Sequence, residues 1–263
     1  MRFRPSFGPD PAFPYLDETR RYRFPDPLKG KGDIIALGGN LSPGMLLSAY
    51  EQGLFPWYNP EDPILWQSPD PRFVLFPEKL HISRSMAKVL KKGVFTVRFD
   101  HNFPGVIRSC AAADRSGKND PEPPGTWITA DMIAGYTTLH RLGFAHSAES
   151  YAADGELAGG CYGIRLGNVF FGESMFTRQS NASKAAFLTL AHLLFNDGVQ
   201  FIDCQAHTDH LESLGAQEIS RPRFLALLGE ALAGRNSAPS PDIADALDRR
   251  GDWGQKAPLS KNQ

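Results

Sequence analysis

Four strand-like runs in the second half of the chain determine its architecture: AHSAESY (145–151), ELAGGCYGIRL (156–166), NVFFGESMF (168–176) and VQFIDCQ (199–205). Each run is short, rich in apolar side chains and bounded by turn residues, which is typical of β-strands. Asp154-Gly155 and Gly167-Asn168 separate the first three runs and favour tight hairpins. The pattern predicts three antiparallel strands followed, after an interval, by a fourth buried strand.

That interval carries the longest helical pattern, which runs from an expected cap at Asn181 to about Phe195. Further elements lie upstream and downstream. Strands are predicted at 73–76 and 95–99, and helices at 42–53, 83–92, 102–113, 129–142, 209–214 and 221–233. This order predicts an α+β fold with a mixed sheet, largely antiparallel in the middle, and helices packed on it.

The chain divides by composition into three expected parts: a small N-terminal domain (1–72), a catalytic domain (73–235) and a disordered polar tail (236–263). Phe13 and Phe24 are expected to rest on the body of the protein. An aromatic loop closes the first part, and its prolines between 56 and 71 argue against regular structure there. A proline-rich exposed loop is expected at 114–125.

Bulk properties limit the functional classes. The net charge of −1 means that a nucleic-acid partner would need a local basic patch. The three cysteines are far apart and form no CxxC pair, which favours a reduced protein without disulfides. No apolar run has the length of a signal peptide core or a membrane helix. We therefore expect a soluble cytoplasmic protein with no membrane partner.

The helix predicted at 83–92 has cations on one face, at Arg84, Lys88, Lys91 and Lys92. Four cations on one face suit phosphate binding. A solvated surface helix has the same pattern, and periodicity alone favours it.

The N-terminal part gathers five large aromatic residues: Tyr50, Phe55, Trp57, Tyr58 and Trp66. Aromatic rings beside a basic patch can stack on exposed RNA bases. Taken alone, however, this set is better explained as a small hydrophobic core built from large side chains.

Polar residues interrupt the apolar strands at Ser147, Glu149, Glu173, Asp203 and Gln205. Because Asp203 and Gln205 are two residues apart, both should point to the same sheet face. Carboxylates on such strands are costly unless they are paired or functional. The set predicts either a site that holds a nucleophilic amine or a buried polar network that only fixes the core.

Other motifs are weak. Cys204, His207 and His210 have metal-like spacing but no fourth ligand, so we expect no metal. GESMF (172–176) lacks the second glycine of a nucleophile elbow. The sequence contains neither GxxxxGK[ST] nor GxGxxG, so we expect no cofactor and a donor that is already activated.

Seven segments together resemble the bacterial leucyl/phenylalanyl-tRNA–protein transferases. They keep their order from about residue 34 to 229, and they are LGGNLSPGMLLSAYEQGLFPWY (37–58), ILWQSPDPRFVL (64–75), LHISRSM (80–86), GTWIT (125–129), AHSAE (145–149), FFGESMFTRQSNASK (170–184) and IDCQAHTDHLESLGAQEI (202–219). Several of these are long and unusual in composition.

The resemblance implies a small N-terminal domain and a larger domain of the GNAT acetyltransferase type. It implies transfer of Leu or Phe, with Met as a further donor, from aminoacyl-tRNA to proteins that begin with Arg or Lys. The product would enter the bacterial N-degron route of protein degradation. The implied partners are the 3′ end and acceptor stem of the tRNA and the acceptor protein.

The resemblance also implies roles for individual residues. Asp203 and Gln205 match residues proposed to act in peptide-bond formation, and Glu173 matches a residue near the aminoacyl group. Aromatics around the aminoacyl-adenosine end match Tyr50, Trp57, Trp127 and Tyr136. The donor side-chain pocket falls on Cys161, Phe170, Met175, Phe187 and Ile202. The tRNA-binding cluster matches Arg84, Lys88, Lys91 and Lys92.

Two pocket positions depart from the family pattern, with Cys161 where Met is expected and Phe187 where Leu is expected. The preference between Leu and Phe therefore stays open. For the reaction, we expect Asp203 to orient the acceptor amine and help to deprotonate it, while Gln205 and Glu173 fix polar groups nearby.

Two other functions fit parts of the sequence. An acyl-CoA-dependent N-acetyltransferase would need a [QR]xxGx[GA] turn, which the sequence lacks. A non-catalytic tRNA-binding protein would explain the basic helix and the aromatics, but not the polar residues on apolar strands.

Overall fold

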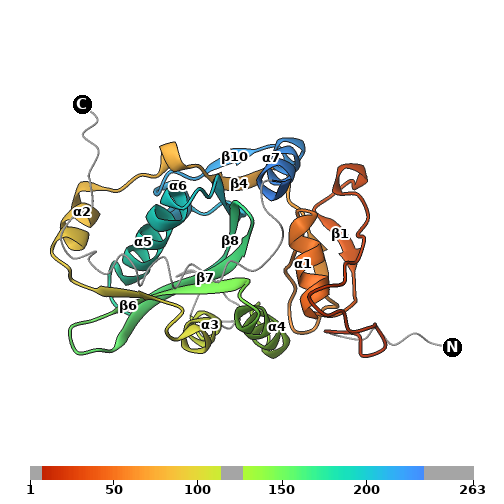
Figure 1. Cartoon of the computed structure of the whole chain (residues 1–263), viewed down its shortest axis with the longest axis horizontal. Coiled ribbons are helices and arrows are strands. Elements are labelled where there is room, and N and C mark those ends of the chain that lie inside the picture. The colour runs from red at the N-terminus through yellow and green to blue at the C-terminus, as the bar shows by residue number, and fades with distance from the viewer. Residues whose placement is uncertain (1–7, 114–126, 234–263) are drawn as a thin grey trace.

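The computed structural model describes residues 8–113 and 127–233. The predictions of an exposed loop at 114–125 and of a disordered tail at 236–263 lie outside these residues. Figure 1 shows the chain as a central sheet flanked by helices, with the N-terminal part at one end of the long axis.

The central sheet has seven strands in the order β10-β4-β9-β8-β7-β6-β5. Their bounds are β4 (Arg72–Leu75), β5 (Thr96–Phe99), β6 (Ala145–Tyr151), β7 (Leu157–Leu166), β8 (Val169–Thr177), β9 (Phe201–Gln205) and β10 (Gln217–Ile219). Every neighbouring pair is antiparallel except β8 and β9, which are parallel. The expectation of a mixed, mostly antiparallel sheet is confirmed, whereas β10 was not predicted.

The parallel pair is short. Its register runs from Val169 opposite Phe201 to Phe171 opposite Asp203. Strand β8 then continues to Thr177, while the end of β9 pairs with β4 on its other side. Residues just past the last parallel pair, including Glu173 and Gln205, therefore lie where the two strands are no longer joined to each other.

Helices cover both faces of the sheet, and strand alternation assigns each side chain to one of them. Their bounds are α1 (Pro43–Glu51), α2 (Arg84–Lys91), α3 (Phe103–Ala111), α4 (Ala130–Arg141), α5 (Ala182–Asn196), α6 (Asp209–Glu212) and α7 (Arg221–Ala233). Phe170 packs in the hydrophobic cluster that contains α5, and its neighbour Phe171 packs in the cluster that contains α3 and α4. The strands are thus buried on both faces.

Side chains cap the starts of helices α2 and α4. Ser83 accepts a hydrogen bond from the Met86 amide at the start of α2, and Thr129 accepts one from the Met132 amide at the start of α4. Asn181 was wrongly expected to cap α5 with its side chain. It makes no such bond and instead has a left-handed backbone with a φ of 72°.

The N-terminal part contains regular structure where the prolines argued against it. A three-stranded sheet joins β1 (Ile34–Leu37), β3 (Leu65–Gln67) and β2 (Phe55–Pro56) in that order. The sheet tolerates Pro56 because β2 is an edge strand, where a missing N–H donor costs little.

The large aromatics form a small core in this region. Tyr50, Phe55, Tyr58 and Trp66 are buried, and the Phe24 ring lies 5.0 Å from the Trp66 ring. Phe13 packs against the same core. The expectation that Phe13 and Phe24 rest on the body is therefore confirmed, and the core explanation holds for four of the five aromatics.

Candidate active site

Glu173 on β8 is the centre of a buried polar network formed by Tyr50, Tyr136, Glu173 and Gln205. The Glu173 side chain lies on the sheet face away from α5 and is 7% exposed. Its Oε1 is 2.7 Å from the Tyr50 hydroxyl and 2.8 Å from the Gln205 amide nitrogen. Its Oε2 is 2.9 Å from the Tyr136 hydroxyl. We call these four residues the Glu173 network.

The oxygen contacts within this network require three hydrogens. The Tyr50 and Tyr136 hydroxyls lie 2.5 Å apart, and each also contacts Glu173, which makes three oxygen–oxygen contacts in a ring. Each contact needs one hydrogen between its two oxygens. The two phenols supply two, so an ionised Glu173 leaves one contact without a hydrogen. A proton on Glu173 completes the ring.

Electrostatics agree with this count. Burial raises the pKa of the Glu173 carboxyl from its ordinary 4.5 to about 7, against the lowering effect of hydrogen bonds from Tyr50, Tyr136 and Gln205. Burial also raises the pKa of Tyr50 and of Tyr136 well above 10, so both stay phenols at neutral pH. Glu173 is therefore the group in the network that exchanges a proton near pH 7.

Asp203 on β9 belongs to a different arrangement. It is 0% exposed, and both of its oxygens accept hydrogen bonds from Arg72, at 2.8 Å from Nε and 2.6 Å from Nη2. Its Oδ1 also accepts the backbone N–H of Gln205 at 2.9 Å. An acceptor amine has no access to this carboxylate unless Arg72 moves away.

Gln205 connects the two arrangements. Its backbone is bonded to Asp203, and its side chain donates to Glu173. Its φ of 64° lies in the left-handed region, which is unusual for a residue other than glycine, asparagine or aspartate. The expected proximity of Glu173, Asp203 and Gln205 is therefore realised as one continuous chain of hydrogen bonds.

Arg72 is the residue of this site that the sequence analysis missed. Its guanidinium is fully buried between the rings of Phe55 and Phe224, 4.8 Å and 4.3 Å from the ring centroids. A signal was present, because Arg72 begins one apolar strand while Asp203 interrupts another. Two opposite charges on buried strands of one sheet are expected to pair.

The five residues expected to form the donor side-chain pocket gather on the other face of the sheet. Cys161, Phe170, Phe187 and Ile202 are buried in the cluster that contains α5, and Met175 packs against it. We call these five residues the α5-side cluster. Burial raises the pKa of the Cys161 thiol, so this side chain is uncharged at neutral pH.

The remaining aromatics differ in exposure. Trp57 is 41% exposed and lies near the Phe55 ring, whereas Trp127 is partly buried against the core. Of the set expected around an aminoacyl-adenosine, Trp57 is the member best placed to stack on a base.

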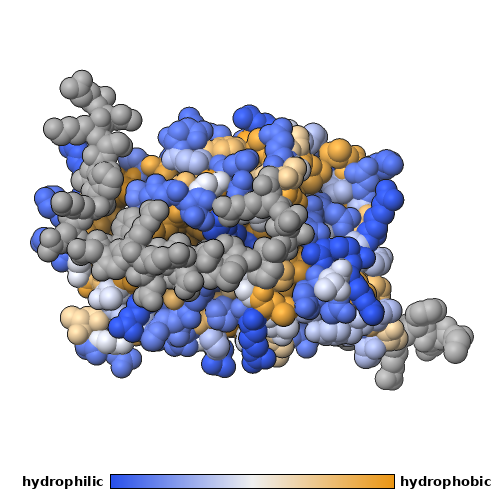
Figure 2. All heavy atoms as spheres, in the orientation of Figure 1, coloured by the Kyte–Doolittle hydropathy of each residue, from blue (hydrophilic) through white to orange (hydrophobic). Residues whose placement is uncertain are grey.

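The basic residues of α2 all face solvent. Within the described residues, no carboxylate lies within 4.0 Å of Arg84, Lys88, Lys91 or Lys92. Met86 on the opposite side of the helix is buried with residues of β4 and α5. Figure 1 places α2 at the end of the long axis opposite α1, and Figure 2 shows hydrophilic residues along the uncovered edge at this end.

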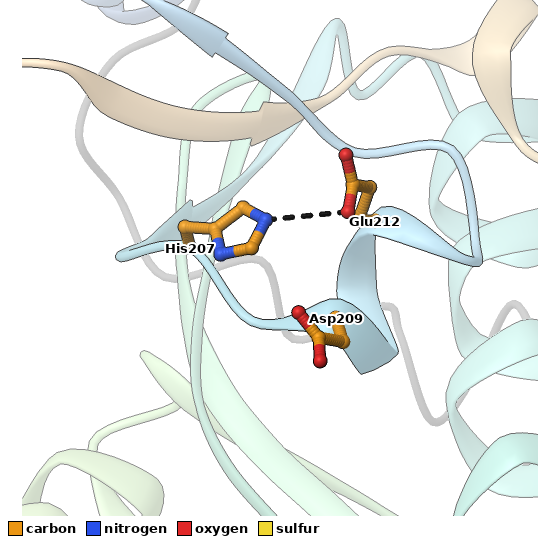
Figure 3. Close-up of side chains that lie close together, drawn as sticks. All are labelled: His207, Asp209 and Glu212. Atoms are coloured by element: carbon orange, nitrogen blue, oxygen red, sulfur yellow. Dashed lines mark hydrogen bonds and ion pairs between the residues drawn. The ribbon is translucent and has the colours of Figure 1, made fainter.

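Cys204, His207 and His210 do not form a group of close ligand atoms among residues 8–113 and 127–233. Cys204 is buried, and its thiol points back to the Ile202 carbonyl. In the described part of the chain, the group with close ligand atoms is instead His207, Asp209 and Glu212, within 4.8 Å of one another (Figure 3). All three are exposed, as acidic surface groups without a metal commonly are.

Ser147 and Glu149 on β6 form a separate buried pair. The Ser147 hydroxyl donates to Glu149 Oε1 at 2.6 Å, and burial raises the pKa of the Glu149 carboxyl. Neither residue bonds to the Glu173 network in the described structure, so the polar set from the sequence divides into two groups.

The described residues contain no helix that is long and apolar enough to cross a membrane. A solved structure titled "The structure of L-PGS from Bacillus licheniformis" aligns with 64% of this chain and 65% of that chain. Its TM-score of 0.38 and sequence identity of 11% are too low to support a conclusion about the fold.

Family comparisons cover most of the chain. The model described as leucyl/phenylalanyl-tRNA protein transferase matches residues 74–229, and the model for the N-terminal domain of that family matches residues 39–70. A relative from Syntrophobacter fumaroxidans with the same name is 54% identical over 78% of this chain and 86% of its own. Another from Myxococcus xanthus is 49% identical over 82% of this chain and 91% of its own. The chain therefore belongs to the leucyl/phenylalanyl-tRNA–protein transferase family of aminoacyltransferases.

Proposed function

We propose that this enzyme transfers a leucyl or phenylalanyl group, with methionyl as a further donor group, from aminoacyl-tRNA to the amino terminus of a protein that begins with Arg or Lys. The observation that carries the proposal is the Glu173 network, a neutral-pH proton acceptor placed where β8 and β9 part. Such a group suits a reaction in which an amine must lose a proton.

The donor ester is already activated, so the reaction needs positioning and proton transfer but no ATP. The acceptor amine attacks the ester carbonyl, the C–N bond forms, and the bond from carbon to the ribose oxygen breaks. We assign the amine proton first to Glu173 and then to the departing ribose oxygen. A pKa near 7 suits both transfers, because the same group must gain and lose a proton within one cycle.

Asp203 has a different role in this scheme from the one expected from sequence. Both of its oxygens are bound by the Arg72 cation and it is 0% exposed, whereas the hydrogen-bond partners of Glu173 are neutral and Glu173 is 7% exposed. We therefore assign it to orienting Gln205, and we assign the proton transfer to Glu173. Gln205 then fixes the Glu173 carboxyl through its side-chain amide.

The donor molecule would lie along the long axis of the protein. We place its side chain against the α5-side cluster, its terminal adenosine near Trp57 and Trp127, and its acceptor stem along α2. The exposed cations of α2 support this placement, because phosphates bind well to unpaired Lys and Arg on one face.

Three further assignments accompany the proposal. The larger domain, from residue 73, is assigned to the GNAT acetyltransferase type on the strength of its mixed sheet with helices on both faces. The residues before it are assigned to a small N-terminal domain. The cellular role is assigned to the cytoplasmic N-degron route, in which the added Leu or Phe marks the acceptor for degradation.

One assay distinguishes this function from its two competitors. Purified protein is incubated with Phe-tRNA labelled in Phe, with labelled acetyl-CoA and with a peptide that begins with Arg. Transfer of the Phe label to the peptide supports the proposal. Transfer of the acetyl label would indicate an acetyltransferase, and binding of the tRNA without transfer would indicate a binding protein.

A further inference from the structure

Arg72 occupies a position in which every part of its guanidinium is constrained. Its Nε and Nη2 bind the two oxygens of Asp203, and its Nη1 donates to the Gly53 carbonyl at 3.3 Å. The Phe55 and Phe224 rings lie over the guanidinium at 4.8 Å and 4.3 Å. The side chain is 0% exposed.

We propose that Arg72 is a positioning residue for the transfer reaction: it holds the Asp203 carboxylate in place, so that Asp203 fixes Gln205 in the backbone conformation that directs the Gln205 amide to Glu173. This inference rests on the proposed function for its kinetic part. Arg72 touches no substrate in this scheme and acts through Asp203.

Gln205 has an unusual backbone conformation. Its left-handed φ of 64° is unfavourable for a residue with a Cβ and persists only where the surroundings enforce it. Within the described structure, the hydrogen bond from its N–H to Asp203 Oδ1 holds the backbone at this point. If Asp203 rotates, the Gln205 N–H loses that acceptor. The side-chain amide of Gln205 is then no longer held in position to donate to Glu173.

Asp203 is a buried carboxylate whose two oxygens are both bound by Arg72. A buried carboxylate needs a paired charge, and a planar guanidinium that binds both oxygens fixes its rotation as well as its charge. Lysine would supply the charge from a single nitrogen and leave the carboxylate free to turn. The geometry at this position therefore requires arginine specifically.

Arg72 contacts both of the segments that match the family. Arg72 lies between residues 39–70 and residues 74–229. It binds Gly53 and Phe55 on the first side and Asp203 and Phe224 on the second. Through Arg72, the N-terminal part contributes to the geometry at Glu173.

The test compares Arg72→Lys with Arg221→Lys. Arg221 is another buried arginine, and its side chain binds the Pro27 and Gly32 carbonyls and Asp33, outside the hydrogen-bond chain to Glu173. We expect Arg72→Lys to lower kcat about 100-fold, as a misplacement of about 1 Å does. The KM for Phe-tRNA should stay within about 3-fold, because the interaction matters after binding. Arg221→Lys should keep the wild-type kcat.

A second readout does not depend on activity. Amide hydrogen exchange at the Gln205 N–H should be at least about 10-fold faster in Arg72→Lys than in wild type and unchanged in Arg221→Lys, because the acceptor on Asp203 is no longer fixed. A wild-type protein that fails to join Phe to the peptide would refute the proposed function but leave this measurement valid. Wild-type exchange at Gln205 in Arg72→Lys would refute the positioning role.

If Arg72→Lys does not fold, Phe224→Leu replaces it. This change removes the nearer ring, so the guanidinium is no longer held on that side and can shift together with the Asp203 carboxylate. We expect a several-fold lower kcat, an unchanged KM and faster Gln205 exchange. A folded variant, of either kind, that keeps the kcat and Gln205 exchange of the Arg221→Lys control overturns the inference. So does a variant in which only KM changes.

Discussion

Where β8 and β9 part, the two faces of these strands differ in chemistry although the same strands build both. On one face, Asp203, Gln205 and Glu173 continue a chain of hydrogen bonds that begins at Arg72. On the other, Phe170 and Ile202 pack into the apolar α5-side cluster. On β9, strand alternation separates the two faces, since Ile202 and Asp203 are neighbours in sequence. On β8, the register skips Glu173 between the pairs Tyr162–Ser174 and Gly163–Gly172. The proposed proton-transfer site and the proposed donor pocket therefore include residues that are neighbours in sequence, and we expect that each can be altered independently.

The largest effect that this comparison predicts is on the polar face. Glu173→Gln can keep neutral hydrogen bonds to Tyr50 and Tyr136 but cannot accept a proton. We expect kcat to fall by about 10²- to 10⁴-fold, the range for loss of a general base. In wild type, kcat should rise with pH through about 7 as Glu173 ionises, and the variant should lack this step.

Glu149→Gln is the matched control, because Glu149 is also a buried carboxyl but lies outside the Glu173 network. The Glu149→Gln variant should keep both the rise of kcat near pH 7 and most of the activity. A Glu173→Gln enzyme with the wild-type pH profile would remove Glu173 from the proton transfer and leave Asp203 as the candidate.

A second prediction concerns the stability of the same face. The folded protein binds the Glu173 proton with a pKa of about 7, above the ordinary 4.5, so wild type is stabilised below about pH 4.5 and loses that stabilisation as pH rises through about 7. The difference corresponds to about 3 kcal/mol. Glu173→Gln stays neutral throughout. The free energy of unfolding of the variant minus that of wild type should therefore increase between these two pH values.

Urea unfolding at pH 5 and pH 8 measures this difference. The difference in free energy of unfolding between variant and wild type should stop increasing above about pH 8. An equal difference between variant and wild type at both pH values would show that Glu173 ionises in the folded protein as it does in the unfolded chain.

The third prediction addresses the apolar face. Phe187→Leu removes part of a large ring from the α5-side cluster and should shift donor preference toward Phe over Leu. A change of this size in a hydrophobic pocket is worth about 1–3 kcal/mol. The pH dependence of kcat should be unchanged, which would separate the two faces directly.

Phe195→Leu makes the same substitution on the same helix, in a residue that packs against the larger hydrophobic cluster around α5 but is not one of the five residues of the α5-side cluster. It should leave the Phe:Leu ratio near that of wild type. Equal ratios in Phe187→Leu and wild type would place the donor side chain elsewhere.

The smallest expected effect lies far from both faces. Replacing Lys88, Lys91 and Lys92 by alanine should weaken binding of all tRNAs alike and should reduce the slope of log affinity against log salt by about 2 to 3. Neither kcat at saturating donor nor the Phe:Leu ratio should change. Filter binding at several salt concentrations gives the slope, with Lys29 and Lys31 replaced by alanine as the control. A slope that matches wild type would place the phosphates elsewhere.

Strands with a strong local pattern were predicted from the sequence, whereas strands that depend on pairing with a distant strand were not. Alternation and turn residues located β6, β7, β8 and β9, because these strands carry strong local patterns. The three residues of β10 were not predicted, since QEI has no pattern of its own and forms a strand by pairing with β4. The small N-terminal sheet was missed for a related reason: edge position makes Pro56 tolerable, and edge position is a tertiary property.

The candidate site shows the same division. Glu173, Asp203 and Gln205 were found because polar residues on apolar strands are conspicuous. Their roles could not be read from spacing. The pairing of Asp203 with Arg72 joins residues 131 positions apart, and the proton count at Glu173 depends on two phenols brought from α1 and α4. Such roles follow from three-dimensional contact, which local sequence patterns do not contain.

The N-terminal segment that packs on Trp66 has a consequence for the lifetime of the protein. A protease that cut the chain just before Asp33 would take away the Phe24 ring and the Pro27 and Gly32 carbonyls that receive the Arg221 guanidinium. One side of Trp66 would then be exposed to water, and the buried Arg221 guanidinium would lose two carbonyl acceptors and keep Asp33. Clipping at this point should therefore destabilise the whole enzyme, and an intact N-terminal segment is a simple marker of folded, long-lived material.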